Sequence, residues 1–375
     1  MNFSLTEDQR MLVDAAQAFC RKQSPIARAR KLRDDPRGYS AEVWRQLGEL
    51  GWLGLIVPEA AGGLGGRFVD LALVLEQLGA TLVPEPVAST TAAIAAVVAA
   101  GDLAQQQAHL APVLAGQHTL ALAWAERDGR YDPRQVATTA MPTAGGYRVV
   151  GDKRFVLDGH AAAQLVVSAA APDGLALFVI DAGAPGVTIR PVATIDGRRA
   201  ALIALDVAVA GARRLAGDGG AALADALDVG AAAACAEGVG VMRAVLAMTT
   251  AYLQTREQFG VKIGSFQVLQ HRAVDMFIET ELAYSAMLAA AIRVDDATAD
   301  ADERSGAVAA AKIQLADSGR FVTQQAIQLH GGIGITDEHD VGLYFKRMVA
   351  LNATFGDAGA QLARYAARPA FTAGL

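Results

Sequence analysis

Residues 254–271, QTREQFGVKIGSFQVLQH, contain the side chains whose types and spacing best suit binding of a polar ligand. Arg256 and Gln258 precede a predicted turn that begins at Phe259. Gln267 lies at the start of the next predicted helix. A planar guanidinium can bind a pyrophosphate through two charge-assisted hydrogen bonds. The stretch therefore indicates contact with a large phosphorylated ligand.

A second stretch, QLHGGIGIT at residues 328–336, ends a long predicted helix. Gly331 is expected to stop the helix, and Gly332 directly after it lets backbone N–H groups approach a bulky ligand. Gln328 lies one turn before these glycines. Either stretch alone is equally consistent with helix capping and core packing. Together, in this order in a helical bundle, they favour ligand binding.

Other motifs do not point to chemistry. The six histidines do not pair with one another or with cysteine at metal-ligand spacing, so no metal site is expected. Neither a G-x-S-x-G elbow nor a P-loop occurs. The glycine-rich run at residues 61–66 is interpreted as a turn between helices, and His160 and His330 as structural residues.

The elements that must position these residues fall into three segments. Helical periodicity runs to about residue 118, with Thr6 and Ser40 as predicted N-caps and further helices at 68–82 and 89–100. Short β-rich runs follow, and four long helices end the chain. We therefore predict an α+β multidomain fold with an N-terminal helical domain (1–118), a middle antiparallel β-barrel or sandwich (119–220) and a C-terminal four-helix bundle (221–375). A Rossmann sheet is not expected, because no βαβ alternation is visible.

Composition excludes several classes of protein. Of the 375 residues, 53% are hydrophobic and 19% charged, which is typical of a packed globular protein. The net charge of −6 argues against a nucleic acid or an anionic membrane as the main partner. Residues 229–248 are apolar but interrupted by Glu237 and Arg243, which favours a core helix. With Cys20 and Cys235 expected as free thiols and no signal peptide predicted, a cytoplasmic location is expected.

The helix–β–helix order and three motifs resemble the acyl-CoA dehydrogenase family over nearly the whole chain. The motifs are VWRQLGELGWLGLIVPEAAGGLGG at 43–66, REQFG at 256–260 followed by a glutamine, and QLHGGIG at 328–334. The resemblance implies an oligomeric flavoenzyme of lipid metabolism that removes an α proton and a β hydride from an acyl-CoA thioester. It implies FAD at a subunit interface and electron transfer flavoprotein as acceptor. The residues that it assigns to the FAD of a neighbouring subunit are Arg256, Gln258, Phe259, Gln267, Gln328, Gly331 and Gly332.

The segment that resembles the family's own flavin-ring and thioester contacts departs from the family pattern. Ala125, Arg127 and Tyr131 replace the threonine, proline and serine of a Thr-Glu-Pro loop. Phe155 and Leu157 replace a tryptophan and a small hydroxyl residue. Hydrogen-bond donors to the flavin and the thioester are therefore expected to be missing.

The catalytic base also departs from the family pattern. The family places a glutamate near the C-terminus, and a gapless match puts Gly356 there. Asp357 is the nearest carboxylate, but one residue further along a continuing helix rotates a side chain by about 100°. An alternative family position for the glutamate matches Gly230. Glu237, two turns later, is expected to be structural.

The motifs that contact a neighbour's FAD are present, whereas the residues for the flavin ring, the thioester and the base are missing. This difference leads to three hypotheses. The first is a small, base-deficient subunit of a heteromeric acyl-CoA dehydrogenase, paired with a second, catalytic acyl-CoA dehydrogenase subunit in an α2β2 tetramer. The endings YFKRM and TFGDA resemble such small subunits, of the pimeloyl-CoA and steroid side-chain types. The second is a self-sufficient homo-oligomer that uses Asp357 as base. The third is a redox-inactive acyl-CoA-binding or structural homologue. The sequence does not predict the acyl group.

Overall fold

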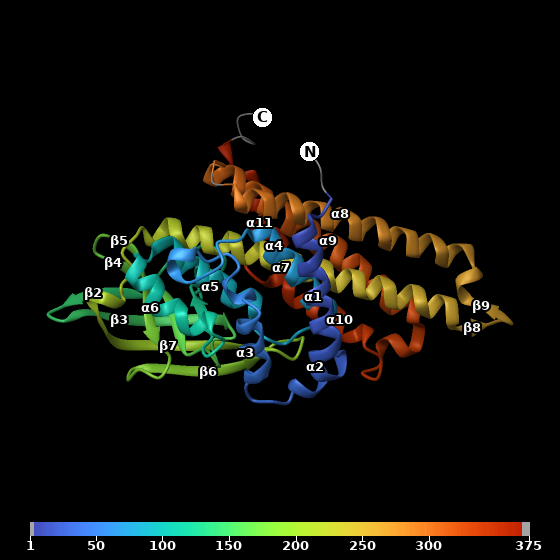
Figure 1. Cartoon of the computed structure of the whole chain (residues 1–375), viewed down its shortest axis with the longest axis horizontal. Helices are drawn as coiled ribbons and strands as arrows, with labels where there is room; N and C mark the ends of the chain where they lie inside the picture. The colour runs from blue at the N-terminus through green and yellow to red at the C-terminus, as the bar shows by residue number, and fades with distance from the viewer. Residues whose placement is uncertain (1–3, 297, 370–375) are drawn as a thin grey trace. The chain divides into compact units, whose positions relative to one another are not determined.

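The computed structural model describes residues 4–296 and 298–369 (Figure 1). Its internal contacts divide it into two compact units. One unit contains Lys31–Arg67 and Pro84–Gly230, and the other contains Met1–Arg30, Phe68–Val83 and Ala231–Leu375. The predicted helix–β–helix order is confirmed, whereas the domain boundaries at 118 and 220 stay a prediction.

Helices of the first unit begin where capping side chains meet apolar runs. The Ser40 side chain accepts the N–H of Val43 at 3.3 Å, so α3 (Ala41–Glu49) begins where predicted. Helix α5 (Val87–Ala100) is apolar on every face and packs on strand β1 (Leu120–Ala123). Helix α6 (Leu103–Leu114) was not predicted, although Asp102 and Gln105 form a capping box at its start.

A seven-stranded sheet forms the middle of the chain, in the order β1-β4-β2-β3-β7-β6 with β5 paired to β4. Most neighbouring strands are antiparallel, as predicted, but β1 and β2 run parallel to β4, so the sheet is mixed. Short turns join the antiparallel pairs β2–β3, β4–β5 and β6–β7, whereas no short turn joins β1 or β2 to β4. The other strands are β2 (Thr139–Thr143), β3 (Gly146–Leu157), β4 (Gln164–Ala171), β5 (Gly174–Asp181), β6 (Val187–Ala193) and β7 (Arg199–Ala210).

The second unit is a helical bundle that includes the four long helices predicted from the sequence. Figure 1 shows α7 and α8 running side by side and joined by a short hairpin. A short helix, α11, follows them and was not predicted, and α1 and α4 from the N-terminal part pack in the same unit. The helices are α1 (Glu7–Gln23), α4 (Phe68–Ala80), α7 (Gly219–Thr255, from residue 231), α8 (Gln267–Asp295), α9 (Ala301–His330), α10 (Val341–Ala353) and α11 (Ala358–Ala366).

Glycines allow α4 and α7 to cross in backbone contact. A Cβ atom on Gly240 would lie 1.9 Å from the carbonyl oxygen of Glu76, and one on Gly79 would lie 2.1 Å from that of Glu237. Any larger residue would force the helices apart. Helix α7 is long and apolar enough to cross a membrane, but 78% of its most apolar window is buried in the protein, as in a core helix.

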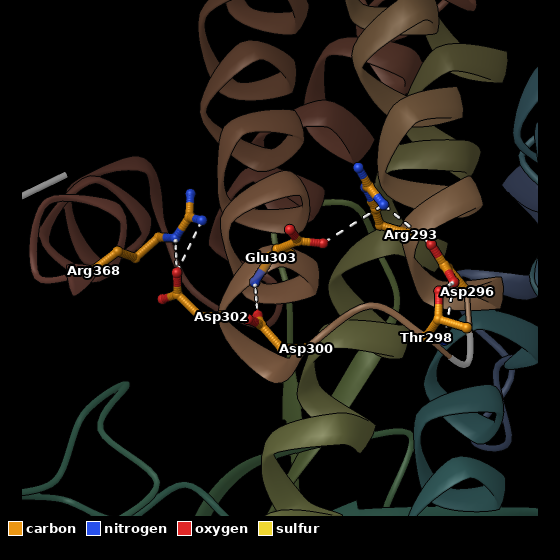
Figure 2. A network of polar contacts seen from close by, with 7 residues as sticks. All are labelled: Arg293, Asp296, Thr298, Asp300, Asp302, Glu303 and Arg368. Carbon is orange, nitrogen blue, oxygen red and sulfur yellow. Dashed lines mark hydrogen bonds and ion pairs between the residues drawn. The ribbon is translucent and has the colours of Figure 1, made fainter. Parts of the chain in front are cut away.

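Charged side chains close the α8–α9 turn and attach the C-terminal end of α11 (Figure 2). Asp300 caps α9 by accepting the N–H of Glu303 at 2.7 Å. Arg293 on α8 lies 3.6 Å from the Glu303 carboxylate. Arg368, just after α11, donates to Asp302 at 3.0 and 3.1 Å. These contacts are exposed or half-buried, so we interpret them as stabilising the turn rather than as a functional site.

Candidate cofactor-contact site

The predicted Phe-Gly turn is the two-residue loop of a short β-hairpin. Helix α7 ends at Thr255, and strands β8 (Glu257–Gln258) and β9 (Val261–Lys262) follow. Phe259 (φ +56°) and Gly260 (φ +79°) both occupy the left-handed region, as a type I′ turn requires. The Phe259 side chain is 91% exposed and contacts only the edge of Phe266 among the rings of the described chain. An aromatic residue is therefore held outward, where it contributes little to its own chain's core.

Arg256 joins α7 to this hairpin. Its N–H still bonds to the carbonyl oxygen of Tyr252 at 2.9 Å, as in a last helical turn. Its exposed guanidinium makes no hydrogen bond or ion pair within residues 4–296 and 298–369. Gln258 is also exposed and bonds only to the carbonyl oxygen of Glu257, at 2.9 Å. The positive charge of Arg256 is thus available to an anionic ligand.

Helix α8 starts directly after the hairpin, with Gln267 as its exposed first residue. Ser265, two residues before the helix, does not cap it. Phe266 occupies the N-cap position and offers no capping side chain, and the Ser265 hydroxyl instead donates to the carbonyl oxygen of Lys262 at 2.7 Å. First-turn N–H groups of α8 are therefore left without a side-chain cap.

The glycine turn after α9 exposes its backbone. Gly331 (φ +63°) ends the helix, and its N–H bonds to the carbonyl oxygen of Gln328, whose side chain is exposed. A Cβ atom added to Gly331 or Gly332 would meet nothing within 4 Å. By contrast, a Cβ atom on Gly334 would lie 2.6 Å from the carbonyl oxygen of Ile327. Packing therefore explains Gly334, whereas the first two glycines leave open backbone for an outside group.

Stacked rings bring the two predicted motifs to the same end of the bundle. The ring centroids of Tyr252 on α7 and His330 at the end of α9 lie 4.5 Å apart with the planes 30° from parallel. Tyr252 lies one helical turn before Arg256, and His330 directly precedes Gly331. Arg256 and the open glycines therefore lie at the same end of the bundle, although Gly331 follows Arg256 by 75 positions in the sequence.

The position of the family glutamate is a chain reversal. Helix α10 ends at Ala353 and α11 begins at Ala358, with Phe355 at φ +56° and Gly356 at φ +109° between them. The helix does not continue through this point, so the expected rotation of Asp357 along a helix was based on a wrong premise. Asp357 is instead the N-cap of α11, where its carboxylate accepts the N–H of Ala360 at 2.8 Å.

Two buried side chains that the sequence analysis missed fix this reversal. Lys312 on α9 donates to the carbonyl oxygen of Leu351 at 2.7 Å, and burial lowers the pKa of Lys312 to about 8. Gln361 on α11 donates to the carbonyl oxygen of Phe355 at 2.9 Å. A Cβ atom on Gly356 would lie 2.6 Å from the Gln361 Nε2 atom. A glutamate at this position would have to displace the Gln361 amide and adopt φ +109°, which side-chain-bearing residues rarely do.

Glu237 is a structural acid, as expected. Its side chain is 4% exposed, and Arg347 on α10 donates to its two carboxylate oxygens at 2.7 and 2.8 Å. A carboxylate that accepts two guanidinium hydrogen bonds is a poor proton acceptor, because protonation would break the pair.

In the sheet, the segment expected to contact a flavin ring is anchored by another buried pair. Lys153 on β3 donates to Glu126 at 2.6 Å and to Ser168 at 3.0 Å, and burial lowers the pKa of Lys153 to about 8. A β-bulge follows, in which Phe155 (φ +47°) is 63% exposed. This segment offers Ala125 and Phe155 where the resemblance expects hydroxyl and indole groups. Among the described residues, no cluster of histidine, cysteine or acidic side chains could hold a metal ion.

Comparison with known proteins decides the family. Models of the acyl-CoA dehydrogenase N-terminal, middle and C-terminal domains match residues 6–117, 121–205 and 217–369. The chain belongs to the acyl-CoA dehydrogenase family. Acyl-CoA dehydrogenase IpdE2 of Mycolicibacterium smegmatis is 31% identical to it, over 96% of this chain and 98% of the relative.

Solved acyl-CoA dehydrogenase structures share the whole fold. A variant of the Tcur3481-Tcur3483 steroid ACAD matches with a TM-score of 0.89 and 33% identity, over 98% of this chain and 99% of that chain. The ChsE4-ChsE5 complex from Mycobacterium tuberculosis matches with a TM-score of 0.89 and 29% identity, over 97% of each chain. The resemblance drawn from the REQFG and QLHGGIG motifs is therefore confirmed at the level of the family and its fold.

Proposed function

We propose that this acyl-CoA dehydrogenase family member is the small, base-deficient subunit of a heteromeric FAD-dependent enzyme that desaturates an acyl-CoA thioester. One observation carries the proposal. The chain presents a free guanidinium and open glycines at the same end of the bundle. Asp357, next to one family base position, and Glu237, two turns after the other, are engaged in a helix cap and an ion pair. Such a chain is equipped to contact a cofactor and not to abstract a proton.

The exposed groups fit the pyrophosphate of FAD. Arg256 can neutralise one phosphate with two hydrogen bonds, and the backbone at Gly331 and Gly332 can approach the other, because nothing in the chain fills the space where their Cβ atoms would be. The amides of Gln258, Gln267 and Gln328 are exposed at or near these two motifs and can supply further hydrogen bonds. When bound, FAD supplies the acceptor for the hydride that leaves the substrate β-carbon.

The proton acceptor must then come from another polypeptide. Asp357 accepts an N–H at the start of α11, and the Gly356 turn is closed by Lys312 and Gln361. Losing a general base reduces turnover by about 10²–10⁴-fold. We therefore assign this chain the task of holding the cofactor across a subunit interface, and its partner the task of proton abstraction.

An exposed apolar face on α8 supports assembly with a partner. Val274, Ile278 and Leu282 recur four residues apart and are 54%, 48% and 48% exposed. Neighbouring Phe277 is 54% exposed. A contiguous apolar face of this kind is typical of a protein–protein contact. The match to the ChsE4-ChsE5 complex supports a second acyl-CoA dehydrogenase chain as the partner, and we propose an α2β2 tetramer with electron transfer flavoprotein as acceptor.

Co-expression with a neighbouring acyl-CoA dehydrogenase gene tests the proposal. We expect the chain alone to bind FAD poorly and to lack turnover, and the co-purified complex to be yellow and active. Ile278→Glu, which puts a charge on the α8 face, should prevent co-purification. A lone chain saturated with FAD that turns over acyl-CoA would overturn the proposal.

Matched variants test the cofactor contacts in the complex. Arg256→Ala removes a charged hydrogen-bond donor and should weaken FAD binding by about 10–100-fold. Gly332→Ala should also weaken it, without loss of thermal stability, because its Cβ atom meets nothing within the chain. Gly183→Ala is the control, since its Cβ atom likewise meets nothing within 4 Å but belongs to the other compact unit and to neither predicted motif. FAD titration followed by flavin fluorescence gives the affinities.

A further inference from the structure

Three rings from separate segments stack beneath the candidate site. Tyr252 lies on α7, His330 on the last turn of α9, and His339 in the loop before α10. His330 is in the middle, with ring centroids 4.5 Å from both Tyr252 and His339. Tyr252 and His339 also meet edge to face, at 6.4 Å. The stack therefore ties the ends of two long helices and a loop to one point.

The hydrogen bonds of His330 leave one of its nitrogens unused. Nδ1 lies 2.8 Å from the carbonyl oxygen of Ala326, which assigns the proton to Nδ1 in the neutral ring. Nε2 is buried and has no hydrogen-bond partner in the described part of the chain, and the residue is 2% exposed. His339 Nδ1 accepts the N–H of Val341 at 3.2 Å, which assigns its proton to Nε2. Both imidazoles are thus arranged as neutral rings.

We propose that the Tyr252–His330–His339 stack positions Arg256 and the Gly331–Gly332 turn for the FAD pyrophosphate, and that it does so only while His330 is neutral. The inference rests on the proposed function and adds a pH-dependent positioning role for residues that do not themselves touch the cofactor. Because Tyr252 lies one turn before Arg256 and His330 directly precedes Gly331, separating the rings moves both sides of the site.

Protonation of His330 is unfavourable in the folded chain. It would add an N–H to the buried Nε2, which has no acceptor, and place a positive charge beside His339. Burial lowers the pKa of His330 and His339 lowers it further, whereas the hydrogen bond to the Ala326 carbonyl group raises it.

The charged side chains on the segments packed against His330 do not offset the cost of protonating it. Arg256 follows Tyr252 and is itself positive. Around His339, Arg30 binds Asp340 at 2.9 Å and lies 3.5 Å from Asp337, so these two carboxylates are already paired. Glu338, between them and next to His339, is exposed to solvent. Acid therefore favours a state in which the stack opens.

Histidine NMR of the chain gives a readout that does not depend on turnover. We expect the His330 ring to stay neutral as the pH falls through about 6.5, the ordinary pKa of a histidine. The His330→Phe variant identifies the resonance. A His330 signal that titrates at or above the ordinary histidine pKa would overturn the proposal.

FAD affinity of the assembled complex provides the second test. Between pH 7.5 and a lower pH, below the point at which the His330 signal titrates, the wild-type affinity should fall, by up to about tenfold per pH unit below that point. His330→Phe keeps a stacking ring that cannot be protonated, so it should bind FAD well and lose most of this pH dependence. His330→Ala should bind FAD weakly at both pH values. His118→Gln, at an exposed position, should follow the wild type.

Tyr252 provides an independent pair of variants if the His330 variants do not fold. Tyr252→Phe should retain FAD affinity, and Tyr252→Leu should lose it. Wild-type pH dependence in His330→Phe, or full affinity in Tyr252→Leu, would overturn this inference alone. An Arg256→Ala complex with undiminished FAD affinity would instead overturn the proposed function.

Discussion

Arg347 on α10 donates two hydrogen bonds, of 2.7 and 2.8 Å, to the carboxylate of Glu237 on α7. Their side chains are only 11% and 5% exposed, so the pair is almost sealed from water. This relationship explains why an acid on α7, two turns from an alternative family base position, is not available as a base. It also joins α10 to α7 at the crossing with α4, where Gly79 meets the Glu237 carbonyl group.

Breaking this pair should destabilise the fold strongly. Glu237→Gln removes the negative charge that Arg347 binds in a buried pair, so we expect the free energy of unfolding to fall by about 3–5 kcal/mol. Asp206→Asn is the control, because Asp206 and its partner Arg148 are 55% and 62% exposed and their pair should contribute less than about 1 kcal/mol. Urea denaturation of the three proteins gives the comparison. Equal losses in the two variants would contradict the structural role of Glu237.

Restoring a glutamate at the family position should not create an active enzyme. Gly356→Glu places a side chain at φ +109°, with its Cβ atom 2.6 Å from Gln361 Nε2, which should cost about 1–3 kcal/mol of stability. We expect no acyl-CoA-dependent flavin reduction when the lone variant is supplied with FAD. Gly359→Glu is the matched control, since its Cβ atom meets only Asp357 at 3.4 Å and should leave stability nearly unchanged. Turnover by Gly356→Glu would show that the turn can adapt.

Variants of Asp357 distinguish a role as helix cap from a role as catalytic base. Asp357→Asn keeps an N-cap oxygen and removes the charge, whereas Asp357→Ala removes the cap and should cost about 1 kcal/mol. We expect the complex to turn over at the wild-type rate with either variant, measured by reduction of an artificial electron acceptor. Loss of turnover in Asp357→Asn, with thermal stability unchanged, would favour the self-sufficient homo-oligomer.

The buried Lys312 should be visible in the pH dependence of stability. Burial lowers its pKa to about 8, so between pH 8 and pH 10 the unfolded chain binds the proton more tightly than the folded chain. Wild-type stability relative to Lys312→Met should therefore rise with pH, by up to about 1.4 kcal/mol per pH unit. Urea unfolding at several pH values measures the slope. The exposed Lys262→Met variant should show no such change, and a flat difference for Lys312→Met would contradict the assignment.

Much of the fold could be predicted because its signals are local. Thr6 and Ser40 cap α1 and α3 as expected, since a capping side chain acts within three residues of itself. The capping box of α6 was an equally local signal that went unused. The parallel pairing of β1 with β4 had no such signal, because partners 44 residues apart are not joined by a turn.

For the site, the sequence by itself determined the family and the exposed residues that we propose to face a cofactor. Their motifs are short and keep their spacing, so Arg256 and Gly331 can be recognised without any knowledge of packing. Only the tertiary structure decided what happens to the acids. Glu237 and Arg347 are 110 residues apart, and Lys312 and Leu351 are 39 apart. Periodicity reports which face a side chain occupies and not which distant partner it meets, so the partners of Glu237 and Lys312 became visible only in the tertiary structure.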